Sequence, residues 1–278
     1  MIDVNIKPKD NLEEIFNNMV EFVRSLGVKV NTNTKARGHQ GFFLKDRIDI
    51  CKDITHERKI EVLIHEFTHY IHAKIDFNIA KSGGDLEKLF PKSDVKRLSD
   101  ELFAVTMYFD KNKGYKLLKA KRAEILDEIK AISTTIKNTY PEFKRSEPFK
   151  KIEKIIKKTD AKYLLKYDKV KIKTAFIGKL KYYSVDTLDS DFPQFDSNTK
   201  NYLLLKSKQR TLRRISSRIT RITNYYKRPT ELFARFVEAL FIDTNKVSEI
   251  APYTYLVFCK ELSENRFLEL ADFINKFF

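Results

Sequence analysis

Two histidines and a glutamate stand at a spacing that can hold a metal ion and activate water. They occur in His65-Glu66-Phe67-Thr68-His69, which is the H-E-x-x-H pattern. On a helix, residues four apart lie on one face, about 6 Å apart along the axis, so the two imidazoles could grip one zinc ion. The glutamate beside the first histidine could then act as general base on zinc-bound water without binding the metal itself.

The helix that carries this pattern is predicted to be buried. The uncharged residues around the motif are Val62, Leu63, Ile64, Phe67, Thr68, Tyr70 and Ile71. A buried H-E-x-x-H face without a metal would leave several polar groups in need of partners. We therefore favour a metal site over a core helix with two incidental histidines. Thr55 is the predicted N-cap of this helix, and Glu57 suits its first turn.

A catalytic zinc site usually takes three protein ligands, so the third must come from outside this helix. Two glutamates are candidates, Glu101 and Glu231, and both begin the run Glu-Leu-Phe-Ala. The alanine in each run would let its helix approach closely. Both glutamates lie near a predicted helix N-terminus, where a carboxylate is favoured. Arg235 follows Glu231 by four residues and could orient it.

Other polar residues could assist such a site. His72 lies on the face of His65, but about 10 Å away along the axis, so we expect it at the rim of the site or behind the ligands rather than on the metal. Peptide hydrolysis also needs a group that stabilises an oxyanion. Tyr225, Tyr226 and Arg235 are candidates because they are close in sequence to the second glutamate.

Length and charge set limits on the class of protein. The 278 residues suffice for one large domain or two small ones. Lys and Arg number 54 against 38 Asp and Glu, and the surplus of 16 suits either an anionic neighbour such as nucleic acid or a basic soluble protein. Cys51 and Cys259 cannot form a disulfide framework. The chain shows no apolar signal core and no membrane-spanning run, so we expect a cytoplasmic protein without a signal peptide or membrane contact.

The elements expected to position the motif are mostly helices around a small mixed sheet, which is a predominantly helical α+β fold. We predict helices at 9–26, 93–109 and 115–138 and strands at 28–30, 41–44 and 47–51. Three regions follow from this order. Residues 1–112 form a core with the H-E-x-x-H helix, 113–200 form a helical and basic insertion, and 201–278 carry a basic helix, the Glu231 helix and C-terminal helices that complete the core.

The middle of the chain is strongly basic. Residues 144–181 contain fourteen Lys or Arg and four Asp or Glu, with aromatic residues among them. Strands are predicted at 169–176 and 179–185, with a turn at Gly178. The helix predicted at 201–226 carries a basic stripe of Lys206, Arg210, Arg214, Arg218 and Arg221. This stripe is either a solvated helix face or a surface that follows nucleic-acid phosphates.

Several of these segments resemble one family. The chain is similar to zincin-like metallopeptidases of the ImmA/IrrE type and, more closely, to those associated with large polyvalent proteins of phages and mobile elements. The matching runs are Gly41-Phe42-Phe43, Arg47-Ile48-Asp49-Ile50, Leu63–Tyr70 and Arg228–Phe236. They lie within residues 36–77 and 225–242, under a quarter of the chain. Familiar members of the ImmA/IrrE type carry H-E-L-G-H, whereas in this chain Phe67 and Thr68 replace the leucine and the glycine of that motif.

The resemblance implies a zinc-dependent endopeptidase of the gluzincin arrangement that cleaves a protein or peptide. A helix with E-L-F-A-R resembles the third-ligand helix of such proteins, which favours Glu231 over Glu101 beside His65 and His69. Residues 47–51 would line the cleft and pair with an extended substrate. A phage-encoded member could also be virion-associated. The alternative is a basic protein that binds nucleic acid or an acidic partner and has a structural or inactive zinc site.

Overall fold

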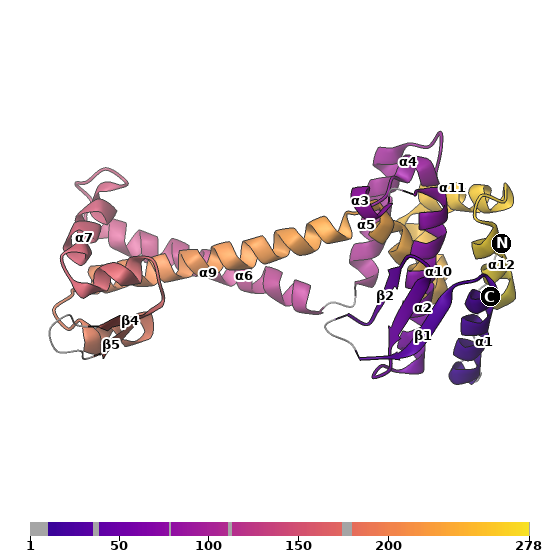
Figure 1. Ribbon diagram of the computed structural model, residues 1–278. Coiled ribbons are helices and arrows are strands. Elements are labelled where there is room, and N and C mark those ends of the chain that lie inside the picture. Colours follow the sequence, from indigo (N-terminus) through magenta and orange to yellow (C-terminus); the bar gives the residue numbers. More distant parts are fainter. Residues whose placement is uncertain (1–10, 36–38, 78, 111–112, 174–179, 278) are drawn as a thin grey trace. The chain divides into compact units, whose positions relative to one another are not determined.

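The structure is a computed structural model that describes residues 11–35, 39–77, 79–110, 113–173 and 180–277. The chain forms two compact units (Figure 1). Unit 1 combines Met1–Lys111 with Thr223–Phe278, and unit 2 is Asn112–Ile222. Unit 2 is thus inserted between the two halves of unit 1. It extends past the predicted boundary at residue 200, because most of the basic helix belongs to it.

Unit 1 contains a three-stranded mixed sheet. Its strands are β1 (Lys29–Thr34), β2 (Gly41–Leu44) and β3 (Arg47–Cys51). The spatial order is β1-β3-β2, with β3 parallel to β1 and antiparallel to β2. The predicted strands at 41–44 and 47–51 are confirmed, whereas the strand predicted at 28–30 runs instead from Lys29 to Thr34; β3 is the central strand. Ile48 and Ile50 of β3 are fully buried, as expected for a strand with neighbours on both sides.

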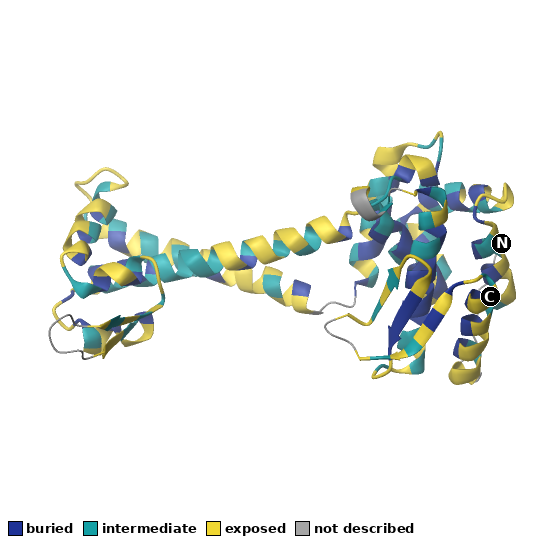
Figure 2. Ribbon diagram, viewed as in Figure 1, coloured by how far each residue is buried: buried dark blue, intermediate teal, exposed yellow. Residues whose placement is uncertain are grey.

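Helix α2 (His56–Ile75) carries the H-E-x-x-H motif. Thr55 caps it as predicted, because its side chain accepts the backbone N–H of Arg58 at 3.3 Å. The helix packs against the sheet and against α1 (Leu12–Ser25). Most residues of its central turns are buried (Figure 2), which agrees with the predicted burial of the motif.

The rest of unit 1 is helical. Its other helices are α3 (Ile79–Ser82), α4 (Leu86–Leu89), α5 (Val95–Phe109), α10 (Pro229–Ile250), α11 (Pro252–Ser263) and α12 (Leu268–Phe277). Helix α10 packs along both α2 and α5, so the C-terminal segment completes the core begun by the N-terminal one. Phe67 of α2, Phe233 of α10 and Phe273 of α12 are each fully buried in this core. The coarse prediction of a helical fold with a small mixed sheet is therefore confirmed.

Unit 2 contains two long helices and a small subdomain. Its helices are α6 (Lys113–Asn138), α7 (Glu147–Lys157), α8 (Leu188–Asp191) and α9 (Ser197–Tyr226), the last of which ends in unit 1; short 3-10 turns span Asp160–Leu165 and Val185–Thr187. Strands β4 (Lys169–Lys173) and β5 (Leu180–Ser184) pair as an antiparallel hairpin. The predicted turn at Gly178 lies outside the described residues. Ile152, Leu164 and Leu203 are fully buried in a separate core.

One carboxylate ties the hairpin of unit 2 to helix α9. Asp168, directly before β4, accepts hydrogen bonds from Ser207 at 2.8 Å, from Arg210 at 2.6 and 3.0 Å, and from Arg214 at 2.8 Å. Burial alone would raise the pKa of Asp168, but hydrogen bonds from Arg210 and Ser207 outweigh it and lower this pKa below its usual value. The folded state therefore favours the ionised carboxylate.

Replacing Asp168 with Asn should lower the free energy of unfolding at neutral pH by about 1–3 kcal/mol, because a hydrogen-bonded charge is lost. The folded-state pKa lies below the unfolded value of about 3.9. The advantage of wild type should thus be complete above that pH and vanish as pH falls through the folded-state pKa. Urea unfolding at pH 7 and at pH 3 measures this. Asp189→Asn removes one exposed ion pair and should change little; equal loss in both variants would contradict the assignment.

Candidate metal centre

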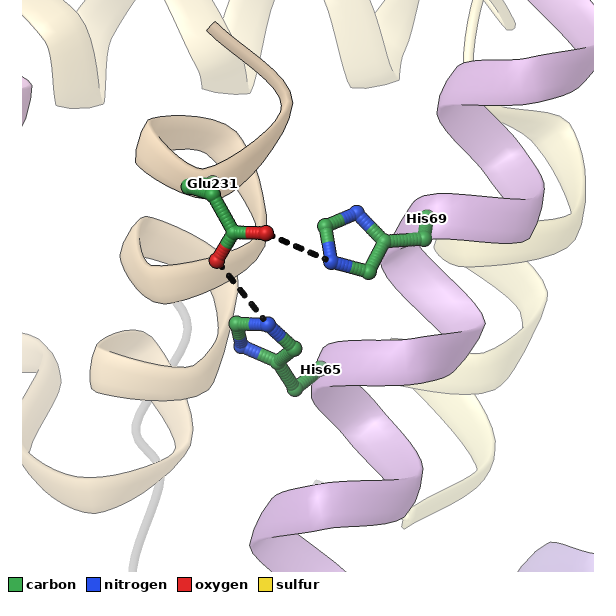
Figure 3. Close-up of side chains that lie close together, drawn as sticks. All are labelled: His65, His69 and Glu231. Atoms are coloured by element: carbon green, nitrogen blue, oxygen red, sulfur yellow. Dashed lines mark ion pairs between the residues drawn. The ribbon is translucent and has the colours of Figure 1, made fainter. Parts of the chain in front are cut away.

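His65 and His69 project from successive turns of α2 toward the carboxylate of Glu231 on α10 (Figure 3). Nε2 of each histidine lies 3.6 Å from a different carboxylate oxygen. The candidate ligand atoms all lie within 4.8 Å of one another. Separations of 3.6 Å exceed an ordinary N–H···O hydrogen bond. They are close to the distance of about 3.3 Å expected between two donors of one tetrahedral zinc ion.

Glu231 reaches the histidines because α10 begins just before it. Pro229 occupies the first turn, where its missing N–H costs nothing. Glu231 stands in the same turn, where the helix dipole favours a carboxylate. The glutamate is buried, and its Oε2 has no hydrogen-bond partner among the described residues. A buried carboxylate oxygen without a partner is what a missing cation would leave behind.

The other ring nitrogen of each histidine is held by a residue of α10. Nδ1 of His65 lies 3.1 Å from the Glu238 carboxylate, and Nδ1 of His69 lies 2.8 Å from the Thr230 hydroxyl. Glu238 is fixed in turn by Arg58 at 2.9 Å. Such partners orient a metal-binding imidazole and leave Nε2 for the ion. The residues present therefore fit a metal ion such as zinc, which His65, His69 and Glu231 could hold.

The charges of this cluster are strongly coupled. Burial alone would lower the pKa of His65, but the nearby carboxylates of Glu231 and Glu238 raise it to about 10. Burial alone would raise the pKa of both carboxylates, yet His65 lowers each to about 2. Burial and the charge of His65 lower the pKa of His69 to about 3. An imidazolium thus lies between two carboxylates, and a cation bound there would displace its proton.

Glu66 lies beside the ligands but faces the sheet. Its buried carboxylate lies against β2, where the backbone of Phe43 partly offsets the rise of its pKa. Gly41 allows this approach, because a Cβ there would lie 2.3 Å from Val62 Cγ1 and 3.3 Å from Glu66 Cγ. Burial raises the pKa of Glu66 to about 7, and repulsion from Glu231 adds to this against the attraction of His65.

The other candidate for the third ligand has a different role. Oε2 of Glu101 accepts the backbone N–H of Thr254 at 2.8 Å and the Thr254 hydroxyl at 3.0 Å. Its Oε1 pairs with Arg97 at 3.1 Å. Glu101 thus anchors the first turn of α11. Of the two glutamates that the sequence left open, Glu231 is the one that lies against the motif histidines.

Of the three residues predicted as candidates for stabilising an oxyanion, only some lie close to the site. Tyr226 is buried and donates its hydroxyl to Asp110 at 2.8 Å, so it faces away from the ligands. Arg235 stacks over the Tyr226 ring at 4.5 Å, and its Nε has no hydrogen-bond partner among the described residues. Tyr225 is the tyrosine beside the cluster. Burial and the nearby charge of Glu231 raise the Tyr225 pKa.

His72 is a core residue rather than a rim residue. It is fully buried, and in the part of the chain that the structure describes neither ring nitrogen has a hydrogen-bond partner. Its ring packs edge-on against Phe233, and a Cβ on Gly84 would come within 2.5 Å of it. Burial lowers the pKa of His72 to about 4, so it is neutral at physiological pH. His72 is therefore not at the rim, and, as expected, it is not among the described residues that could hold a metal.

The strand expected to pair with substrate was also misassigned. Residues 47–51 form the central strand β3, whose two sides are occupied by β1 and β2. β1 and β2 are the two edge strands, and of these β2 lies beside Glu66 through Gly41. A peptide that extends the sheet at this side would therefore pair with β2.

The predicted basic stripe on α9 is divided. Arg210 and Arg214 both pair with Asp168, and Arg210 also donates to the backbone oxygen of Leu165. Arg218 and Arg221 are exposed to solvent. The first two arginines therefore hold unit 2 together, whereas the last two remain available to a ligand.

Comparison with family models, curated proteins and solved structures finds no match to this chain. Among the described residues, no helix is both long and apolar enough to cross a membrane. The geometry of the site is therefore the basis for assigning a function.

Metal analysis should separate the two glutamates. Wild-type protein should bind one equivalent of zinc, and Glu231→Ala should bind far less because a ligand is lost. Glu101→Ala should keep its zinc but unfold about 1–3 kcal/mol more easily, because the buried Thr254 N–H loses its acceptor. Zinc retention by Glu231→Ala together with loss in Glu101→Ala would reverse the assignment.

Glu238→Gln should weaken zinc binding about 10- to 100-fold while preserving the fold, because the acceptor that orients His65 loses its charge. Competition with a chromophoric zinc chelator measures the affinity. Glu261→Gln is the matched control, since Glu261 is equally buried but lies near Arg266, away from the ligands. Unchanged affinity in Glu238→Gln would show that this carboxylate does not support the site.

Proposed function

We propose that the protein is a zinc-dependent metallopeptidase. The observation that carries the proposal is the convergence of two imidazole Nε2 atoms on Glu231, with a second buried carboxylate, Glu66, beside them. Three protein donors suit a catalytic zinc ion, which keeps a position open, better than a structural one, which is usually held by four. The described residues that could hold the ion number three.

His65, His69 and Glu231 would hold the ion. When bound, zinc would polarise the carbonyl of the scissile peptide bond and make water more acidic. Glu66 would take a proton from the attacking water and return it to the leaving amine. Burial and the neighbouring carboxylate of Glu231 favour the protonated form of Glu66, which helps this carboxylate to accept a proton from water.

The strand beside Glu66 suggests how a substrate would bind. β2 is hydrogen-bonded to β3 alone among the described strands, so one of its sides has no strand partner. An extended peptide could add to that side by backbone hydrogen bonds. The scissile bond would then pass close to Glu66, because Gly41 of this strand lies against that side chain. Tyr225 is partly exposed and next to Glu231, which makes it a better candidate than Tyr226 for stabilising an oxyanion.

Glu66→Gln should retain one equivalent of zinc and lose nearly all peptidase activity, because the amide cannot accept the proton from water. Cleavage of an unfolded protein such as casein, with and without a chelator, measures the activity alongside metal analysis. Glu57→Gln, at the exposed start of α2, is the control and should cleave normally. Wild-type cleavage by Glu66→Gln would refute the assigned base, and zinc binding without any cleavage in wild type would favour a non-catalytic site.

A further inference from the structure

The positive charge of the chain belongs entirely to unit 2. Within Asn112–Ile222 there are 29 Lys and Arg against 12 Asp and Glu, a surplus of 17. Unit 1 has 25 against 26, a balance of −1. Ion pairs between described residues engage seven cations of unit 2. Such a concentration of charge repels itself unless an anionic partner covers it.

The β4–β5 hairpin presents part of this charge on one face. Lys169, Lys171 and Lys173 alternate with half-buried residues and are all exposed. Side chains two apart in a strand are about 6.8 Å apart, so the three ammonium groups form a regular row. Tyr182 of β5 is paired with Lys171 and lies on the same face, with the Lys171 Nζ 5.1 Å from its ring centre. We call these four residues the hairpin face.

The tyrosine of the hairpin face is exposed without a structural need. Tyr182 is 65% exposed, and Tyr167, just before β4, is 57% exposed. Tyr183 points to the opposite face, where it packs on Phe192 and donates to Asp160 at 3.2 Å. Tyr183 thus packs into the core of unit 2, whereas Tyr182 is exposed to solvent. A cavity of about 440 Å³, which Lys171 and Tyr182 help to line, adjoins the hairpin face.

The hairpin face continues toward the arginines of α9. Asp168, the residue before Lys169, forms ion pairs with Arg210 and Arg214. The basic side of α9 therefore begins next to the start of β4. Arg218 and Arg221 follow at helical spacing and are exposed. The lysines and the tyrosine of the hairpin face and the two exposed arginines of α9 therefore belong to neighbouring elements of unit 2.

We propose that the hairpin face binds single-stranded nucleic acid, with Tyr182 stacking on a base and the lysine row contacting successive phosphates. Exposed aromatic rings combined with a basic track are the means by which proteins bind single strands without sequence preference. A duplex keeps its bases stacked on one another and would leave Tyr182 unused. An acidic protein would need the lysines but not the ring. This activity is independent of the metal centre, which lies in unit 1.

Fluorescence anisotropy of a labelled oligothymidine with the full-length protein tests the proposal. Wild type should bind the single strand more tightly than a duplex of equal length, with affinity falling steeply as salt rises. Lys169→Ala/Lys171→Ala/Lys173→Ala should reduce the slope of log affinity against log salt by about 2, since each single-strand phosphate contact contributes about 0.7. Tyr182→Ala should weaken binding about tenfold with little change in that slope.

Lys116→Ala/Lys130→Ala/Lys154→Ala is the matched control, because it removes three exposed lysines of α6 and α7 and hence the same charge. It should lose clearly less affinity than the hairpin triple variant. Equal losses in the two triple variants would overturn the proposal, since binding would then follow net charge alone. Tighter binding of duplex, or an unchanged affinity in Tyr182→Ala, would also overturn it. Circular dichroism and thermal unfolding verify that each variant retains a folded unit 2.

Discussion

The packing of α10 against α2 is the constraint on which the candidate site depends. Glu231 of α10 lies against Nε2 of both histidines. Glu238 and Thr230 of the same helix lie against Nδ1 of His65 and of His69, respectively. A small rotation of one helix against the other would misplace every one of these contacts. The phenylalanines between the helices and the surrounding core fix that rotation, since close-packed interiors do not deform gradually. The side chains of the site are thus positioned by two packed helices rather than by loops.

Local spacing was sufficient to predict one side of the site. His65, Glu66 and His69, the Thr55 cap and the burial of α2 follow from residues within one helix, where geometry is regular. The three strands beside it were found from alternation and turn residues. Their spatial order was not, because β3 follows β2 in the chain yet lies between β2 and β1. Because the order was not predicted, substrate pairing was assigned to the central strand β3 instead of the edge strand β2.

Contacts between distant segments were beyond such reasoning. Glu101 and Glu231 stand in the same four-letter run, and only the helices around them distinguish a residue that anchors α11 from one that meets the histidines. Glu238 went unnoticed although it lies seven residues, about two turns, after Glu231 on the same side of α10. Tyr225 and Tyr226 are neighbours, but successive residues of a helix point about 100° apart. Their roles depended on where α9 ends.

The interruption of unit 1 by unit 2 has a consequence for biosynthesis. His69 and Glu231 are separated by 162 residues, which a ribosome needs roughly 10–30 s to translate at ordinary rates. During that interval the emerging α2 lacks the helix that will cover it, and its apolar residues are exposed to solvent or to chaperones. The intervening residues have their own core and can fold meanwhile. The cluster of His65, His69 and Glu231 can therefore assemble only after unit 2 and the start of α10 have been translated.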